Sequence, residues 1–179
     1  SDPGSFLTER NIYNKNILKI VSNSLILMGD GYSENGQFPF IDRLNLNNFS
    51  SKRIYESNYT NKLENILDFD TKKNQLLVRI ESKSDFPNYY FKSLNGKRIN
   101  KITDFKNPFD KLNQVDKQVI SYKRNDGVEL SGVLYLPLGY NKNSKEKMPM
   151  ILWAYPREFK DKNSASQNIN NPNEFTYPY

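Results

Sequence analysis

Short alternations of apolar and polar residues run through most of the chain, and clusters of Asn, Gly, Asp and Lys separate them. A period of two residues is typical of β-strands, whereas an amphipathic helix repeats about every 3.6 residues. The pattern predicts two sets of four strands, at residues 17–21, 24–28, 40–46 and 52–56, then at 66–70, 75–82, 89–93 and 99–102. In the second set, Asn95-Gly96 predicts a two-residue hairpin turn.

Each set places four short strands within roughly 40 to 50 residues, which is the spacing of β-propeller blades. A single blade cannot bury both of its faces, so blades need neighbours. The sequence therefore predicts a mainly β chain that contains two blade-like sheets. A β-sandwich would produce a similar rhythm and is the alternative fold.

The alternation stops between residues 104 and 116, where Pro108 lies in a segment typical of a linker. Beyond it, strands are predicted at 118–123 and 128–136, and Asp126-Gly127 between them indicates a hairpin turn. Residues 148–155 are apolar on both alternating faces, as in a strand covered on both sides in the central sheet of an α/β domain. No helical pattern follows, so we expect this second domain to be incomplete within the chain.

The amino-acid composition and the distribution of charge argue against several kinds of protein. The chain is 36% hydrophobic and 13% aromatic, which favours a packed core over disorder. The net charge is +6, from 26 Lys and Arg against 20 Asp and Glu, but the lysines are scattered, which argues against a nucleic-acid partner. No cysteine is present, no carboxylate group has calcium-loop spacing, and the longest apolar run, residues 25–28, is too short to span a bilayer. We therefore expect no metal, no cofactor and no membrane segment.

Three segments occur in order: YKRNDGVEL at 122–130, LYLPLGY at 134–140 and WAYPREF at 153–159. Together they resemble the prolyl oligopeptidase family of serine peptidases, and in particular its glutamyl endopeptidase branch. FPFID at 38–42 and ITDF at 102–105 resemble the propeller part of that branch. In this family a β-propeller precedes an α/β-hydrolase domain. The resemblance implies that residues 1–113 are the last propeller blades and residues 114–179 the first strands of the hydrolase domain.

The chemistry of such a peptidase requires a serine nucleophile, a histidine base and an orienting carboxylate. The chain contains no histidine and no G-x-S-x-G elbow. The resemblance places the triad downstream of residue 179, so we expect the chain alone to be inactive. It also implies that Tyr155 donates its hydroxyl to the oxyanion, because this tyrosine matches the family's donor at the end of a hydrolase strand. A buried structural aromatic is the alternative role for Tyr155.

Arg157 differs from the small or apolar residue expected in that motif. Its guanidinium could bind the carboxylate of an acidic substrate, or it could form an ordinary ion pair. The expected partners are a peptide substrate and either the remainder of the same protein or a second chain that completes the sheets. The alternative function is a non-catalytic, propeller-like module that binds proteins.

Overall fold

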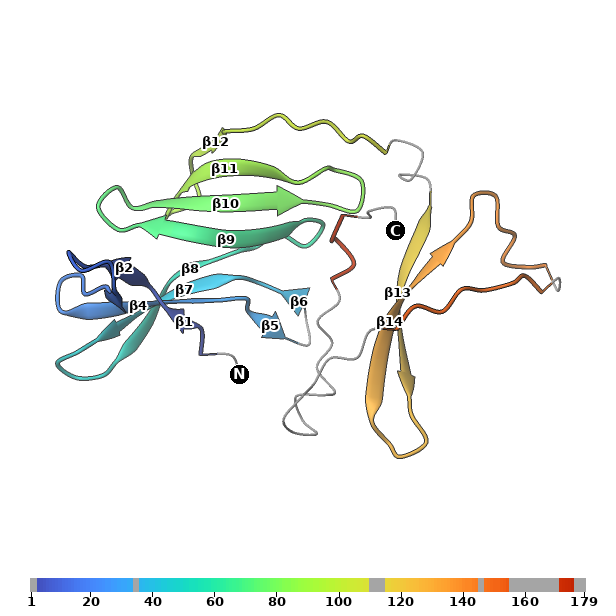
Figure 1. The fold of residues 1–179 in the computed structure, drawn as a ribbon, viewed down its shortest axis with the longest axis horizontal. Helices are drawn as coiled ribbons and strands as arrows, with labels where there is room; N and C mark the ends of the chain where they lie inside the picture. Colours follow the sequence, from blue (N-terminus) through green and yellow to red (C-terminus); the bar gives the residue numbers. More distant parts are fainter. Residues whose placement is uncertain (1–2, 34–35, 110–114, 145–146, 155–170, 176–179) are drawn as a thin grey trace. The chain divides into compact units, whose positions relative to one another are not determined.

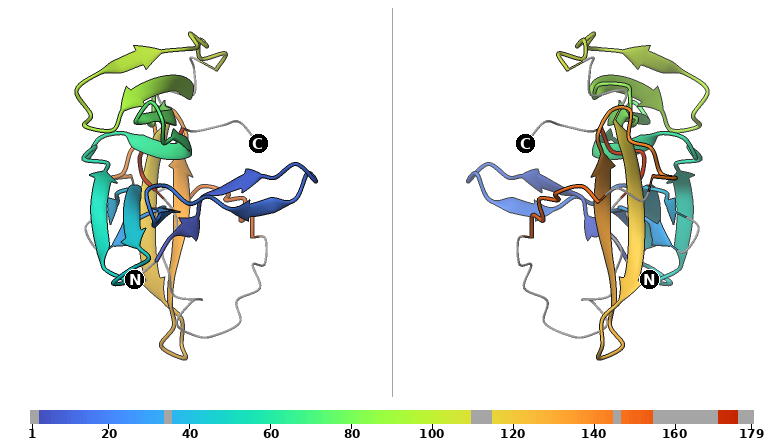
Figure 2. Two further views of the ribbon diagram at one scale, coloured as in Figure 1. Left: turned by 90° about the vertical axis from the view of Figure 1, so that its left-hand side faces the viewer. Right: turned by 90° about the vertical axis from the view of Figure 1, so that its right-hand side faces the viewer.

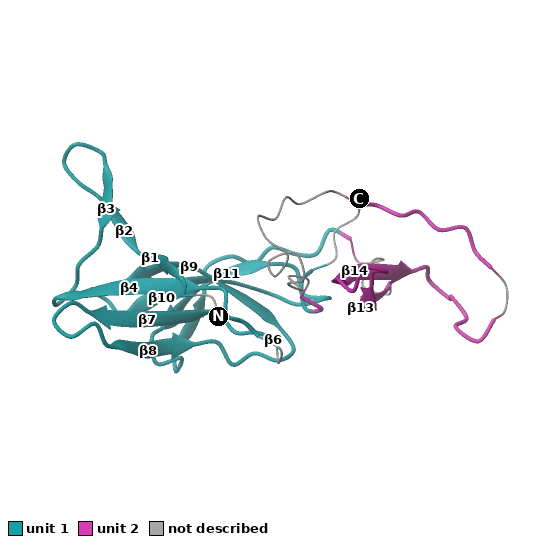
Figure 3. Ribbon diagram, turned by 90° about the horizontal axis from the view of Figure 1, so that it is seen from below, with its two compact units in different colours: residues 1–108, 173–176 teal, residues 109–172, 177–179 magenta. Residues whose placement is uncertain are grey.

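The computed structural model describes residues 3–33, 36–109, 115–144, 147–154 and 171–175, and these residues form strands and turns without a helix (Figure 1). Among these residues there is therefore no helix that could span a membrane. The chain divides into two compact units, Ser1–Pro108 with Asn173–Thr176, and Phe109–Pro172 with Tyr177–Tyr179 (Figure 3).

The first unit begins with a four-stranded antiparallel sheet in the order β1-β4-β7-β8. Its strands are β1 Ser5–Phe6, β4 Ser24–Gly29, β7 Phe40–Asn45 and β8 Ser51–Glu56. Two small hairpins interrupt the meander: β2 Thr8–Arg10 with β3 Asn16–Leu18, and β5 Tyr32–Ser33 with β6 Gly36–Gln37. Each hairpin lies in the chain between two strands of the sheet, but its own strands do not pair with that sheet.

The second sheet of this unit is an uninterrupted meander in the order β12-β11-β10-β9. Its strands are β9 Leu63–Asp70, β10 Gln75–Glu81, β11 Asn88–Ser93 and β12 Ile99–Lys101. Between Leu77 and Val78 the pairing with β9 shifts by one residue, which leaves Leu67 as the extra residue of a β-bulge. The edge strand β8 of the first sheet carries the same kind of shift beside Ile41.

The two sheets of the first unit share one hydrophobic core, and Figures 1 and 2 show them lying side by side. The first sheet contributes Ile26, Ile41 and Tyr55, together with Leu7, the residue between β1 and β2. The second sheet contributes Phe69, Leu76, Val78 and Ile80. Leu76, Val78 and Ile80 alternate along β10, as a strand with one core face requires. The core therefore joins the sheets face to face.

The second unit contains a long hairpin of β13 Asp116–Lys123 and β14 Glu129–Leu136. Arg124 and Val128 close a three-residue loop, in which the Gly127 amide donates to the Arg124 carbonyl at 2.8 Å. Gly127 has a φ of 86°, a left-handed conformation that glycine adopts without a steric penalty. The Asp126-Gly127 pair thus forms the hairpin turn that its sequence predicts.

Several predictions about individual strands were wrong. Residues 17–21 do not open the first meander: β1 occupies that position, and β3 pairs with β2 instead. The turn at Asn95-Gly96 has four residues, because Ser93 and Arg98 are the last bonded pair. Residues 148–154 form no strand, and Ile151 and Trp153 are exposed. A strand requires hydrogen-bonding neighbours, and none of the described residues pairs with this run.

Candidate functional site

The two residues that the family resemblance singles out, Tyr155 and Arg157, lie outside the described residues. Their proposed roles therefore stay predictions. Within the part of the chain that is described, no group of His, Cys, Asp and Glu could hold a metal ion. The chemically notable features that the structure does describe include two polar clusters and a buried carboxylate, Glu81, in the first unit.

The first cluster is a buried ion pair between Glu64 on β9 and Lys92 on β11. Lys92 Nζ lies 2.7 Å from Glu64 Oε2, and the two side chains are 7% and 0% exposed. From the neighbouring sheet, the hydroxyl of Tyr55 donates to Glu64 Oε1. Both carboxylate oxygens therefore have partners, which a buried charge requires. The cluster ties β8 of one sheet to β9 and β11 of the other.

Aromatic rings complete the surroundings of the Lys92 ammonium. Nζ lies 4.7 Å from the ring centroid of Tyr59 and 5.2 Å from that of Tyr55. These distances are within the range of a cation–π interaction. Burial, and then the hydrogen bond to Glu64, raise the pKa of Tyr55 far above its ordinary value. Burial also raises the pKa of Tyr59. The Tyr55 phenol is therefore held neutral, as a hydrogen-bond donor to Glu64.

An open cleft of roughly 510 Å³ borders this cluster. It is lined by Tyr55, Tyr59 and Lys92, and by the turn that contains Asn95 and Gly96. The ammonium that faces the cleft is already neutralised by Glu64. The cluster joins the two sheets, because Tyr55 comes from the first sheet and Glu64 and Lys92 come from the second.

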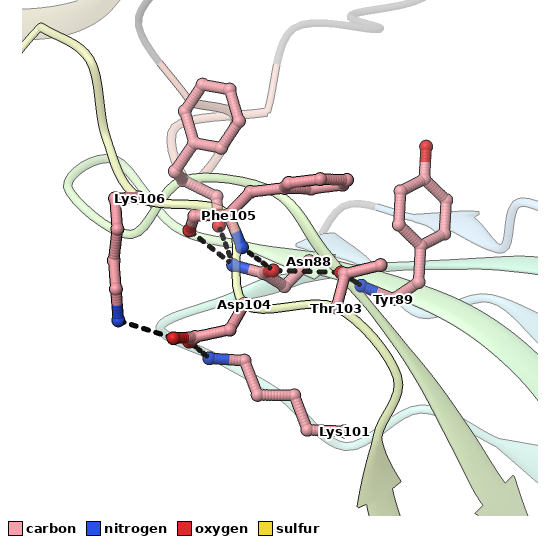
Figure 4. Close-up of polar contacts among 8 residues, drawn as sticks. Asn88, Tyr89, Lys101, Thr103, Asp104, Phe105 and Lys106 are labelled. Atoms are coloured by element: carbon pink, nitrogen blue, oxygen red, sulfur yellow. Dashed lines mark hydrogen bonds and ion pairs between the residues drawn. The ribbon is translucent and has the colours of Figure 1, made fainter.

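The second cluster surrounds the side chain of Asn88 at the start of β11 (Figure 4). Its Nδ2 donates to the carbonyl oxygens of Phe86 at 3.2 Å and Phe105 at 3.0 Å. Its Oδ1 accepts from Thr103 Oγ1 at 2.9 Å and from the Phe105 amide at 2.7 Å. Asn88 is only 6% exposed, and four hydrogen bonds use its amide fully. It therefore fastens the segment after β12 to the sheet.

Asp104 lies between two lysines on the exposed side of the same segment (Figure 4). Lys101 donates to its Oδ1, and Lys106 Nζ lies 2.6 Å from its Oδ2. These two ammonium groups, Lys101 first, hold the pKa of Asp104 at about 2. Next to this segment is a second open cleft, of roughly 380 Å³, in which three lysines face three carboxylates: Lys62, Lys101 and Lys106, with Glu81, Asp85 and Asp104. The lining has no excess charge to select a ligand.

The short C-terminal segment of the first unit packs against the same end of the sheet. The Phe175 amide donates to Glu81 Oε2 at 2.8 Å, and the Phe175 ring meets Phe86 edge to face. Glu81 is 1% exposed and also lies 2.7 Å from Arg79 Nη2. The hydrogen bond from Phe175 to Glu81 joins residues that are 94 positions apart in the chain. The buried carboxylate thus fixes a chain segment.

The segments FPFID at 38–42 and ITDF at 102–105 contain residues with structural roles in the first unit. In FPFID, Phe40 and Ile41 are buried, and Asp42 binds Arg53, whose guanidinium lies over the Phe40 ring at 3.8 Å. In ITDF, Thr103 and Phe105 are bound by Asn88. The sequence did not single out Asn88, Glu64 or Lys92. The only signal for Glu64 and Lys92 was that charged residues fall on core-facing positions of alternating strands.

Comparisons with known proteins show that the chain is similar to proteins named as peptidases. No protein-family model matches the chain. The "Probable glutamyl endopeptidase, chloroplastic" of Oryza sativa subsp. japonica is 33% identical over 98% of the chain. The protein of the same name from Arabidopsis thaliana is 30% identical over 98% of the chain. The chain spans only 20% of the length of either relative. These similarities suggest a peptidase-related family.

Solved structures of the AtxE2 isopeptidase also match part of the chain. One is a variant with Astexin3-dC4 bound, and the other is the apo form. Each covers 69% of this chain and 18% of its own, with a TM-score of 0.43 and 14% sequence identity.

Proposed function

We propose that this chain is part of a serine peptidase of the prolyl oligopeptidase family, in its glutamyl endopeptidase branch. The observation that carries this proposal is the 33% identity to a rice protein with that name, which extends over 98% of the chain. The three ordered motifs at 122–130, 134–140 and 153–159 support it from the sequence.

In this proposal, residues 1–113 are the last blades of a β-propeller and residues 114–179 are the first strands of an α/β-hydrolase domain. Two features support the propeller part. Each four-stranded sheet of the first unit is an antiparallel meander, and the two sheets share one core, as adjacent blades do. The β13–β14 hairpin would then begin the hydrolase sheet.

Two residues carry the chemistry that we assign to the chain. Tyr155 would donate its hydroxyl to the oxyanion that forms on the scissile carbonyl, and Arg157 would bind the side-chain carboxylate of an acidic substrate. The chain contains no histidine to serve as base. We therefore propose that the Ser-His-Asp triad lies elsewhere in a longer protein and that this chain alone does not hydrolyse peptides.

The test uses the full-length protein with two peptides that differ only in having Glu or Gln before the scissile bond. We expect cleavage that a serine-directed phosphonate abolishes, with a higher kcat/KM for the Glu peptide. Arg157→Gln should reduce that preference by about ten- to a hundredfold, the value of one charge-assisted hydrogen bond. Arg124→Gln is the matched control, since Arg124 is an exposed arginine paired with Asp126 in the β13–β14 turn.

The cleavage assay distinguishes a peptidase from a non-catalytic binding module. If the full-length protein cleaves neither peptide but binds both, it is a non-catalytic binding module and the peptidase proposal fails. If it cleaves both but Arg157→Gln leaves the Glu preference unchanged, the peptidase proposal stands and the role of Arg157 is wrong.

A further inference from the structure

The hairpin of β2 and β3 projects away from the sheets of the first unit (Figures 2 and 3). Its strands pair Thr8 with Leu18 and Arg10 with Asn16. Beyond them, Asn11 and Lys15 close a loop of three residues, with the Asn11 amide donating to the Lys15 carbonyl at 2.9 Å. The loop is therefore the outermost point of the hairpin.

Hydrogen bonds within the hairpin itself organise this loop. The Asn14 amide donates to the Asn11 carbonyl at 2.9 Å, and Asn11 Oδ1 accepts from the amides of Tyr13 and Lys15, both at 3.0 Å. Arg10 Nη1 donates to Asn14 Oδ1 at 2.7 Å. Asn14 has a φ of 58°, which asparagine tolerates better than most residues. The tip holds its shape without packing against the rest of the unit.

Large apolar side chains occupy the apex of this organised loop. Ile12 is 91% exposed and Tyr13 is 76% exposed. The two central positions of such a turn usually carry small or polar residues. Ile17 and Leu18 of the second strand, which point to opposite faces of the hairpin, and Ile20 just beyond it are also exposed. The hairpin thus displays a concentration of exposed apolar side chains.

Cationic side chains flank the apex. Between residues 8 and 20 the chain has Arg10, Lys15 and Lys19 against a single carboxylate, Glu9. Arg10 and Lys15 are exposed directly behind the apolar tip. A tyrosine and an aliphatic side chain in front of basic residues are typical of a peripheral contact with a lipid interface. The charge complements a negatively charged surface.

The size of the tip favours a bilayer over a protein surface. A stable protein interface takes about 800 Å² and 20 to 30 residues from each partner. A three-residue loop between strands of three residues each offers much less. A bilayer needs no matching shape, and it accepts two inserted side chains while the basic residues contact the headgroups. We propose that the β2–β3 hairpin is a peripheral contact site for anionic lipid bilayers.

The lipid contact does not depend on peptidase chemistry, and it is tested with the full-length protein, in which every other segment of the protein is present. Sedimentation with vesicles of phosphatidylcholine alone, or mixed with phosphatidylglycerol, should show binding to the mixed vesicles that weakens as salt increases. The double variant Ile12→Ser/Tyr13→Ser should bind at least about tenfold more weakly, because its apolar insertion is lost. The control is Phe49→Ser, which removes an exposed aromatic side chain from the β7–β8 turn and should leave binding unchanged.

A fluorescent probe locates the contact. Within this chain Trp153 is the one tryptophan, so Tyr13→Trp in a background with every native tryptophan replaced by phenylalanine reports on the tip alone. Its emission should shift to shorter wavelength with phosphatidylglycerol vesicles and not with phosphatidylcholine vesicles. Equal vesicle binding by the wild-type protein and the double variant would overturn the proposal. So would lipid-free self-association that the double variant abolishes, since that result assigns the tip to a protein contact.

Discussion

Lys92 donates a hydrogen bond to Glu64 over 2.7 Å, and neither side chain is more than 7% exposed. Replacing one partner leaves the other charge buried without compensation. Lys92→Met or Glu64→Gln should therefore lower the free energy of unfolding by about 3 to 5 kcal/mol. Urea unfolding followed by circular dichroism measures this loss.

Two further variants show whether the pair itself is responsible. Lys62→Met removes an exposed ion pair with Asp85, whose closest atoms are 3.5 Å apart, and should cost less than about 1 kcal/mol. The triple variant Tyr55→Phe/Glu64→Leu/Lys92→Met removes all three groups that form the hydrogen bonds of the cluster and should recover most of the loss. A loss for Lys62→Met as large as that for Lys92→Met would contradict this account.

Tyr55 gives the first unit a stability that depends on pH at the alkaline end. Its pKa is raised in the folded chain, by burial and by the hydrogen bond to Glu64, while in the unfolded chain it lies near 10.0. Above that value the unfolded state loses a proton that the folded state retains, so the free energy of unfolding falls as pH rises. Unfolding measured between pH 8 and about 11 should show a shallower decline for Tyr55→Phe. Parallel curves for the two proteins would be inconsistent with this role.

Local patterns predicted the positions of these turns and of most strands because short-range chemistry dictates them. Asp126-Gly127 makes the β13–β14 turn because the glycine supplies a left-handed residue where the loop requires one. Alternation of Leu76, Val78 and Ile80 predicted β10 because a strand with one core face must alternate. Asn95-Gly96 predicted too short a loop, since Asn95 accepts hydrogen bonds from Lys97 and Ser93 and thereby stabilises a longer turn.

Interactions between distant segments could not be inferred in the same way. Residues 17–21 are as apolar as a strand, but a local apolar run does not reveal that β3 pairs with β2 while β1 pairs with β4. The buried carboxylate Glu64 has partners 9 and 28 positions away, on β8 and β11. Asn88 likewise binds residues up to 17 positions away. Pairing across such separations depends on the sheets coming together, which a periodic pattern does not encode.

Asn88→Ala should release the segment that follows β12. The substitution removes four hydrogen bonds and leaves the Phe105 amide and the Thr103 hydroxyl without their acceptor. We expect a loss of about 1 to 3 kcal/mol in the free energy of unfolding and faster exchange of the Phe105 amide hydrogen. Hydrogen exchange followed by mass spectrometry measures the second effect. Asn95→Ala, in an exposed turn of the same sheet, should leave exchange at Phe105 unchanged, and equal acceleration by both variants would refute the assignment.

Asp104 should titrate at an unusually low pH. The hydrogen bonds and charges of Lys101 and Lys106 hold its pKa at about 2, against an ordinary value of 3.8. Its stabilising contribution is therefore present above the ordinary value and is lost as pH falls through about 2. In an NMR titration of the carboxyl carbon, Lys101→Met should raise the midpoint toward 3.8. High salt should act in the same direction because both lysines are exposed. Lys52→Met, outside the cluster, should not move the midpoint.

Tyr155→Phe tests the catalytic role proposed for this chain. Pro156 disfavours a helical backbone at Tyr155, so the residue is expected to be extended and its phenol to be held in place before the oxyanion forms. Loss of one oxyanion donor should lower kcat of the full-length protein by about ten- to a thousandfold, with little change in KM. Steady-state cleavage of the Glu peptide measures both constants. Tyr122→Phe, which alters an exposed tyrosine of β13, is the control and should retain full turnover. If kcat is unchanged in Tyr155→Phe, the hydroxyl does not contact the oxyanion and Tyr155 is a structural aromatic residue.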